Sequence, residues 1–293
     1  INNIFRNFMR QQKSLHTAFS LIEISIVILI IGILVAGVTQ SSRLVKQFRI
    51  TNAKKLTETT SIYLIKDMVL WLETISDKSL NPLERDNNAT ISQWNDINPG
   101  SSTRFSFVQA SEVNKPQYIE DYKNGLPGID FNKSQGDWLA GTIDNISINN
   151  ITFFIVYSSL NNNIGGSLFH ILDQGNINNS LFLQSGGGDV FQVSGAFASN
   201  YYITTATPRI ITNTLDRNGL NTCYENGVVK FSMSWGVPSP NYTNVSFLIG
   251  KRSDNVYFNG TISELILFAR VLTLDERKEV ESYLSKKWAI KVS

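Results

Sequence analysis

Residues 19–39 form the longest apolar run of the chain, and Glu23 is the single charged residue within it. Every other position of the run is apolar or small. As a helix, a run of this length extends about 30 Å, which is enough to cross the hydrocarbon core of a bilayer. The pattern therefore predicts a membrane-spanning helix. It leaves Glu23 unexplained, because a carboxylate in hydrocarbon costs a few kcal/mol.

The chain becomes polar after Gln40, but a loose helical stripe continues. Leu44, Phe48 and Leu56 recur at helical spacing in this part of the sequence, as they do on one face of an amphipathic helix. We therefore expect the helix to continue beyond the membrane and to end near Asp67.

From Met68 onward, short apolar stretches are separated by segments rich in Asn, Gly and Ser, with no helical pattern between them. This arrangement predicts an antiparallel jelly-roll sandwich. Asn226–Gly227 lies between two β-rich arms and predicts a hairpin turn. Thr273 and Glu276 form a capping-box pattern, which predicts a short C-terminal helix. The buried stripe of that helix is expected to comprise Leu274, Val280, Tyr283, Leu284 and Trp288.

The net charge of +2 gives no electrostatic argument for a nucleic-acid partner. The charge is unevenly placed, because residues 1–18 carry Arg6, Arg10 and Lys13 and no acidic residue. A basic segment before an apolar run is typical of a leader that stays on the cytoplasmic side of a membrane. Cys223 is the only cysteine, so no disulfide forms within the chain. We expect it to be buried in a strand.

Three interpretations of the N-terminal segment compete. A secretory signal peptide has a shorter and uncharged apolar region, although Val35–Gly37 offers small residues for its cleavage. A plain transmembrane anchor fits the length of the run but gives Glu23 no role. The third interpretation is a resemblance: residues 18–38, AFSLIEISIVILIIGILVAGV, resemble the processed N-terminus of type IV pilins and pseudopilins.

The family motif reads F-T-L-I-E, and here Ser20 replaces its threonine. Phe19, Leu21, Ile22 and Glu23 match it, and Gly32 matches a helix glycine that is common in the family. The resemblance implies that a prepilin peptidase cuts between Ala18 and Phe19 and that Phe19 is then N-methylated. Ala18 stands where the family normally has glycine.

In this family the glutamate pairs with the new amino group of a neighbouring subunit inside the packed filament helices. The resemblance therefore assigns Glu23 to assembly, since two groups that are costly in an apolar setting offset one another. Thr39–Ser41 lacks the proline that many major pilins carry, which favours a minor pilin or a pseudopilin.

The remainder of the chain resembles laminin-G-like, concanavalin-A-like domains of bacterial surface proteins. Its most specific part is a G-x-I-x-E strand followed by a capped helix that ends in Y-L-x-x-K-W. The resemblance implies a jelly-roll sandwich, a fold that hosts lectins, glycosidases and spacers alike. It rests on the order and spacing of residues 69–79, 91–100, 115–132, 223–231 and 249–288.

We expect this domain not to be an enzyme. The glycosidases of the fold use an E-x-D-x-x-E run, which the sequence lacks. Glu120–Asp121 and Asp275–Glu276 are adjacent pairs, and adjacent residues of a strand face opposite sides. His170 lies within an apolar strand pattern without a partner motif, so we interpret it as a strand residue rather than a general base.

Calcium serves several families of this fold through aspartates in loops, and Asp173, Asp189 and Asp254 lie near loops here. Aspartate is also a common turn former, so a calcium site is unsupported and no cofactor is expected. Exposed tryptophan and tyrosine offer flat apolar rings to a sugar. The ligand-binding candidates of this kind are Trp94, Trp138, Tyr201, Tyr202 and Trp235.

The sequence thus predicts a minor pilin or pseudopilin of a type IV pilus or a type II secretion-like pseudopilus. It divides into a leader (1–18), a helix (19–67, with 19–39 in the membrane) and a lectin-like head (68–293). The expected partners are a prepilin peptidase, other pilin subunits, the cytoplasmic membrane, and a glycan or surface protein. The head lies outside the cytoplasm, on a single-pass inner-membrane protein or an assembled filament. The alternative is a membrane-anchored lectin-like protein that does not polymerise.

Overall fold

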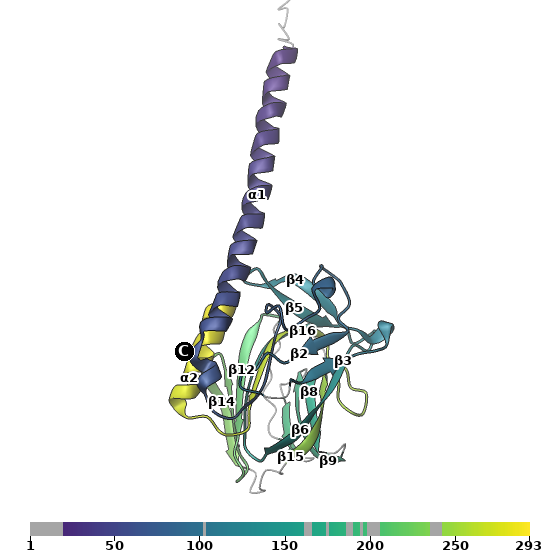
Figure 1. The fold of residues 1–293 in the computed structure, drawn as a ribbon, viewed down its shortest axis with the longest axis vertical. Helices are drawn as coiled ribbons and strands as arrows, with labels where there is room; N and C mark the ends of the chain where they lie inside the picture. Colours follow the sequence, from purple (N-terminus) through teal and green to yellow (C-terminus); the bar gives the residue numbers. More distant parts are fainter. Residues whose placement is uncertain are drawn as a thin grey trace, which may run out of the picture. The chain divides into compact units, whose positions relative to one another are not determined.

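The computed structural model describes residues 20–101, 104–160, 166–173, 176–185, 190–193, 196–197, 206–234 and 242–293. The chain divides by its contacts into two compact units, residues 1–47 and 48–293 (Figure 1). We call the second unit the head. Helix α1 (Leu21–Thr59) contributes residues to both units.

The first part of α1 is long and apolar enough to cross a membrane. By length and composition alone, a membrane anchor and a signal sequence both fit it. Its large apolar side chains from Leu21 to Val38 are all exposed in the structure. Exposure of so much apolar surface indicates that this segment belongs in lipid or against other helices.

The helix ends at Thr59, earlier than the predicted end near Asp67. Thr60 adopts an extended conformation and its side chain accepts a hydrogen bond from the amide of Ile62, which starts the 3₁₀ helix η1 (Ser61–Leu64). The head also begins earlier than Met68, because Ala53 and Thr57 of α1 are already buried in it.

Sheet A is antiparallel, with the order β14-β13-β12-β7-β16-β5-β4. The long strand β16 pairs with β5 through residues 260–262 and with β1 through residues 264–268, so the first and last strands of the head are neighbours. The strands of sheet A are β1 (Met68–Glu73), β4 (Gln117–Lys123), β5 (Leu126–Phe131), β7 (Ile151–Ser159), β12 (Arg209–Leu215), β13 (Leu220–Glu225), β14 (Val228–Ser234) and β16 (Gly260–Phe268).

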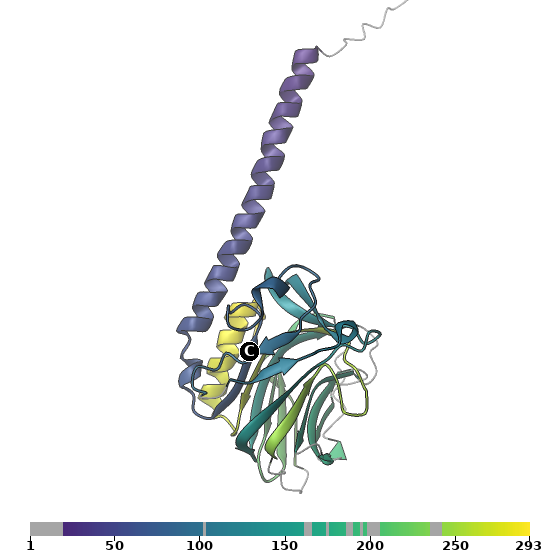
Figure 2. The ribbon, with the colours of Figure 1, turned by 45° about the vertical axis from the view of Figure 1, so that its right-hand side comes forward.

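Sheet B is also antiparallel, with the order β11-β10-β9-β8-β15-β6-β3-β2. It faces sheet A across the main core (Figure 2). Its strands are β2 (Gln93–Asn95), β3 (Ser106–Val108), β6 (Leu139–Ile148), β8 (Gly166–Asp173), β9 (Asn176–Ser185), β10 (Val190–Val193), β11 (Ala196–Phe197) and β15 (Tyr242–Ile249). The two antiparallel sheets packed across one core confirm the predicted jelly-roll sandwich.

Two further 3₁₀ helices of the described residues are η2 (Pro82–Glu84) and η3 (Glu112–Asn114).

Helix α2 (Leu274–Trp288) covers the face of sheet A that points away from sheet B. Strands β7 and β16 are consequently buried on both faces, which explains why the sequence of β7 is a continuous apolar run instead of an alternation. The predicted capping box of Thr273 and Glu276 is confirmed. Of the predicted stripe, only Leu274 is exposed, because it lies in the first turn of α2.

The predicted hairpin turn is also confirmed. Asn226 and Gly227 join β13 to β14 with φ of 50° and 81°. Asparagine and glycine tolerate this left-handed region better than other residues. Cys223 lies buried in β13, as expected.

Candidate functional site

The outer face of sheet B combines polar and apolar rows. Strand alternation points Trp94, Phe107, Ile143 and Phe247 into the core, where all four are buried. Their neighbours in sequence therefore face outward. The polar row crosses four strands, and its members are Asn95, Ser106, Thr142 and Ser246.

The register of the sheet places these side chains beside one another. Asn95 pairs with Ser106, and Ser246 pairs with Thr142. Ser106 donates a hydrogen bond to Asn95 Oδ1 at 2.8 Å, and Gln93 Nε2 lies 2.5 Å from the same oxygen. The row presents neutral amides and hydroxyls that remain partly or fully exposed.

An apolar row runs beside the polar one. Val108 pairs with Ala140, and Ala140 pairs with Leu248. Trp138, one pleat further along, is half-buried, and Lys251 Nζ lies 4.4 Å from the centroid of its ring. A surface with hydroxyl and amide groups on one side and apolar groups with an aromatic ring on the other matches the two kinds of surface of a sugar.

The outer face of sheet B is covered at His170. His170 pairs with Leu248 and so points outward, yet it is fully buried. The segment that contains Ser253 lies against it, and the amide of Ser253 donates to its Nδ1 at 3.1 Å. Burial, together with Arg252, lowers the pKa of His170 to about 4. The imidazole is therefore neutral at pH 7, and its burial agrees with the interpretation of His170 as a strand residue.

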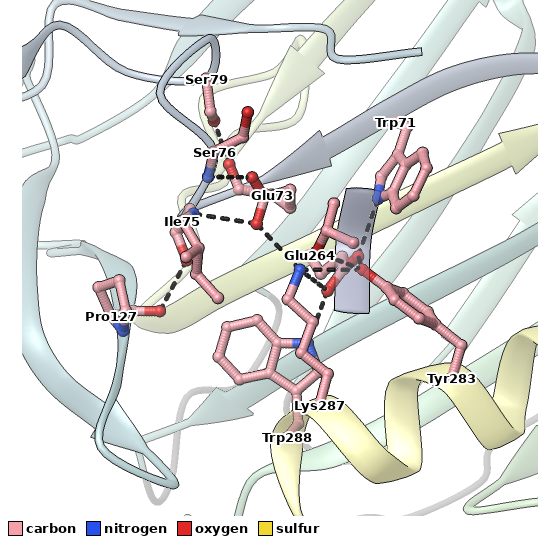
Figure 3. A network of polar contacts seen from close by, with 12 residues as sticks. Trp71, Glu73, Ile75, Ser76, Ser79, Pro127, Glu264, Tyr283, Lys287 and Trp288 are labelled. Carbon is pink, nitrogen blue, oxygen red and sulfur yellow. Dashed lines mark hydrogen bonds and ion pairs between the residues drawn. The ribbon is translucent and has the colours of Figure 1, made fainter. Parts of the chain in front are cut away.

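The second polar feature of the head is a buried ionic cluster between sheet A and α2 (Figure 3). Lys287 Nζ lies 2.9 Å from Glu73 Oε2 and 3.0 Å from Glu264 Oε2, and none of the three side chains is exposed. The cluster joins the first strand of the head, its last strand and its last helix. We call Glu73, Glu264 and Lys287 the buried triad.

Neutral donors complete the hydrogen bonding of Glu264. Trp71 Nε1 and Tyr283 OH donate to its Oε1 at 2.8 and 2.9 Å, and Trp288 Nε1 donates to its Oε2 at 2.6 Å (Figure 3). Burial alone would lower the pKa of Lys287, but the two carboxylates outweigh it and raise that pKa. Because two carboxylates face one ammonium group, Lys287 holds its proton tightly.

Two aspartates of the head are buried without a counter-ion in direct contact. Asp96 Oδ1 accepts hydrogen bonds from the amides of Trp71 and Asn98, and Asp137 Oδ2 accepts one from the amide of Asn132. Burial raises the pKa of Asp96 and of Asp137 to about 6 each.

These shifts predict an effect of pH on stability. The folded state binds more protons than the unfolded state between the ordinary aspartate pKa of about 4 and the shifted value. Each aspartate therefore stabilises the head less as pH rises through this window, whereas His170 acts in the opposite direction. We expect Asp137→Asn to gain about 1–3 kcal/mol relative to the parent between pH 4 and pH 7. Denaturant unfolding of the full chain in detergent measures this, with Asp275→Asn at an exposed position as the matched control.

The five aromatic residues predicted to bind a ligand differ in where they lie. Trp94 is fully buried and donates through Nε1 to the carbonyl oxygen of Glu73, so its interpretation as a sugar-stacking residue is wrong. Trp138 lies on the outer face of sheet B. Tyr201, Tyr202 and Trp235 lie outside the described residues.

At the N-terminal end, Glu23 Oε2 accepts a hydrogen bond from the amide of Ser20 at 2.8 Å, in the first turn of α1. Ala18 and Phe19 lie outside the described residues. Leu21 and Ile22 begin the helix and are exposed.

Asp173, Asp189 and Asp254 were the aspartates considered for calcium. Asp254 forms an ion pair with Arg252 at 2.7 Å, and Asp189 lies outside the described residues. In the part of the chain that the structure describes, no three His, Cys, Asp or Glu residues are arranged to hold a metal ion.

No family model matches the chain, and no curated protein matches it. Solved structures do. The binding domain of Paraclostridial Mosquitocidal Protein 1 is 16% identical with a TM-score of 0.52, over 77% of this chain and 53% of that one. Trypanosoma rangeli sialidase is 12% identical with a TM-score of 0.50, over 78% of this chain and 34% of that one.

Domain 4 of the extracellular arabinanase AbnA from Geobacillus stearothermophilus, solved with arabinotriose, is 16% identical over 76% of this chain and 98% of that one. Its TM-score is 0.48. This chain spans about half of the mosquitocidal structure and about a third of the sialidase. At these identities the likeness concerns the fold alone, and it agrees with the concanavalin-A-like β-sandwich of the head.

Proposed function

We propose that this chain is a minor pilin or pseudopilin that carries a glycan-binding head. The observation that carries the proposal is the register of the N-terminal segment. A basic leader, the junction Ala18–Phe19, the motif S-L-I-E and a long apolar run follow one another without a gap. A signal peptide or a plain anchor has no use for Glu23 at this position.

Two features of α1 support this proposal over a signal peptide. The helix runs unbroken through Val35–Gly37, where a signal peptidase would need to cut. It also continues into the head, where Thr57 Oγ1 lies 3.0 Å from Tyr283 OH and Lys54 Nζ lies 2.6 Å from Asp77 Oδ1. The end of α1 is therefore part of the folded head, and cleavage at Val35–Gly37 would cut within a continuous helix.

The N-terminus of the mature chain tests this processing. We expect coexpression with a prepilin peptidase to yield a chain that begins at N-methylated Phe19. Ala18→Leu should remain uncut, because the larger side chain does not fit where the family has glycine. An N-terminus near Val38, or an intact leader on the parent chain, contradicts the proposal.

The outer face of sheet B supports the second part of the proposal, a head that binds glycans. Its polar row and apolar row carry no charged side chain, and the Lys251 ammonium lies over the ring of Trp138 beside them. We propose neutral glycans as the ligands of the two uncharged rows. Hydrogen bonds from hydroxyls and amides orient a sugar, and apolar contact with a ring adds affinity.

A double variant tests this face. We expect Asn95→Ala with Thr142→Ala to weaken glycan binding about tenfold to a hundredfold, because each lost hydrogen bond is worth about 1 kcal/mol. The full chain in detergent is first screened on a glycan array, and the affinity of the best ligand is then measured for each variant. The exposed pair Thr222 and Ser232, whose hydroxyls lie 2.9 Å apart in sheet A, provides the control alanine variants. Unchanged affinity of the double variant, or an array without any bound glycan, contradicts the glycan-binding proposal.

A further inference from the structure

The buried triad brings an amine and two carboxyl groups into contact in a place from which water is excluded. Lys287 Nζ is 3.0 Å from Glu264 Oε2 and 2.9 Å from Glu73 Oε2, and all three side chains are fully buried. Figure 3 shows Lys287 pointing from α2 between the two glutamates. An amine held against a carboxyl group has the high effective concentration that favours condensation over separation.

The hydrogen bonds around Glu264 suit it to be the group that is attacked. Trp71 Nε1, Tyr283 OH and Trp288 Nε1 all donate to its carboxyl oxygens, at 2.8, 2.9 and 2.6 Å. Donors held in this way stabilise the negative charge that develops on a carboxyl oxygen when a nucleophile adds to the carbon.

Glu73 is placed to move protons. Its Oε2 accepts from the amide of Ile75 at 2.9 Å and its Oε1 accepts from the amide of Ser76. These backbone donors fix the carboxylate beside Lys287 without occupying the ammonium group. A carboxylate within hydrogen-bond reach of the reacting amine meets the geometric requirement for a general base.

We propose that Lys287 Nζ and Glu264 Cδ condense to an intramolecular isopeptide bond, with Glu73 as the proton carrier and release of one water molecule. A proton first moves from the Lys287 ammonium to the Glu264 carboxylate, which gives a neutral amine and a neutral acid. The amine attacks Cδ, and Glu73 takes a second proton from the nitrogen. Glu73 then delivers this proton to the departing hydroxyl, the C–O bond breaks, and water leaves. No redox partner is needed.

Burial disfavours the charged forms and so makes the first step less costly than it would be in water. Burial raises the pKa of Glu264, even though Lys287 lowers it in part. The ionised form of Lys287 still dominates, because the carboxylates also raise its pKa. The reaction therefore proceeds through a minor neutral pair and is expected to be slow, as a single event in the lifetime of a folded chain.

Such a bond would tie α2 covalently to β16. Strand β16 lies between β7 on one side and β1 and β5 on the other, so the helix would be fastened to the middle of sheet A. The consequence is that the last helix cannot detach from the sandwich under load or in denaturant.

The intact mass of the full chain, purified in detergent and measured under denaturing conditions, tests the inference. We expect the parent chain to be lighter than its processed sequence by one water molecule. Tryptic digestion should leave the bond after Lys287 uncut and yield a branched peptide that joins Glu264 to Lys287. Trypsin should still cleave after the exposed neighbour Lys286, because its amine is free to solvent.

Three variants separate the roles. Lys287→Arg keeps the charge but cannot form the bond, and Glu73→Gln removes the proton carrier, so both should have the full mass. Lys286→Arg should remain lighter by one water molecule. A parent chain of full mass that is cleaved after Lys287 overturns the inference even if the variants fail to fold. A branched peptide that contains Glu73 in place of Glu264 overturns the assignment of roles.

Discussion

Lys287→Met is expected to destabilise the head by about 3–5 kcal/mol, because it leaves two fully buried carboxylates without their counter-ion. Methionine has about the length of the lysine stem, so the effect arises from charge rather than from a cavity. The loss should decrease toward low pH, because burial raises the pKa of Glu264 and the protonated acid needs no counter-ion. Denaturant unfolding of the full chain in detergent, followed by the fluorescence of the buried tryptophans, measures it.

Lys286→Met is the matched control. Lys286 occupies the preceding position of the same helical turn but is exposed, and we expect a change within about 0.5 kcal/mol. Equal stability of the two variants would show that the buried triad is not an ionic cluster. If the isopeptide bond forms, Lys287→Met removes it as well, and the difference between the variants becomes larger.

Glu23→Ala is expected to abolish co-assembly with other pilin subunits while leaving membrane insertion and leader removal intact. The alanine removes the only charge of the apolar run, so insertion becomes easier. In a filament, the new amino group of a neighbouring subunit then lacks its partner in an apolar setting. We expect incorporation to fall by about a hundredfold or more, since an unpaired buried charge costs several kcal/mol.

Glu23→Gln separates charge from shape in this experiment. It should fail to assemble like the alanine variant, although it still accepts a hydrogen bond from the amide of Ser20. Ser25→Ala serves as the control, because Ser25 only bonds back to the carbonyl oxygen of Leu21 within the same helix. Incorporation is measured as the fraction of the chain in sheared filaments, relative to the membrane fraction. Normal incorporation of the glutamine variant would contradict the role of Glu23.

The elements of the head follow from local pattern. The capping box gave helix α2, and Asn226–Gly227 gave the hairpin. The end of α1 could not be read in this way, because residues up to Asp67 keep helix-compatible spacing. There the side chain of Thr60 starts a new 3₁₀ turn. The pairing of β1 with β16 cannot be predicted from a local pattern either, because the two strands lie at opposite ends of the head in the sequence.

The candidate sites needed the structure for two different reasons. The outer face of sheet B depends on the register of four strands, which no local pattern contains. The sequence alone does not single out Lys287, because charged residues are normally exposed. It nevertheless lies at helical spacing from Val280 and Tyr283, on the stripe of α2 that is predicted to be buried. That position was the signal. The burial of Trp94 could also be inferred from the sequence, because alternation with the polar neighbours Gln93 and Asn95 points its side chain inward.

The composition of sheared surface filaments from the native host tests the proposed function most directly. We expect mass spectrometry of this fraction to find peptides of the head together with an N-terminal peptide that begins at methylated Phe19. In cells that lack the prepilin peptidase, the chain should stay in the membrane with its leader attached. A chain that is absent from filaments and carries the same N-terminus with and without the peptidase would contradict the proposal.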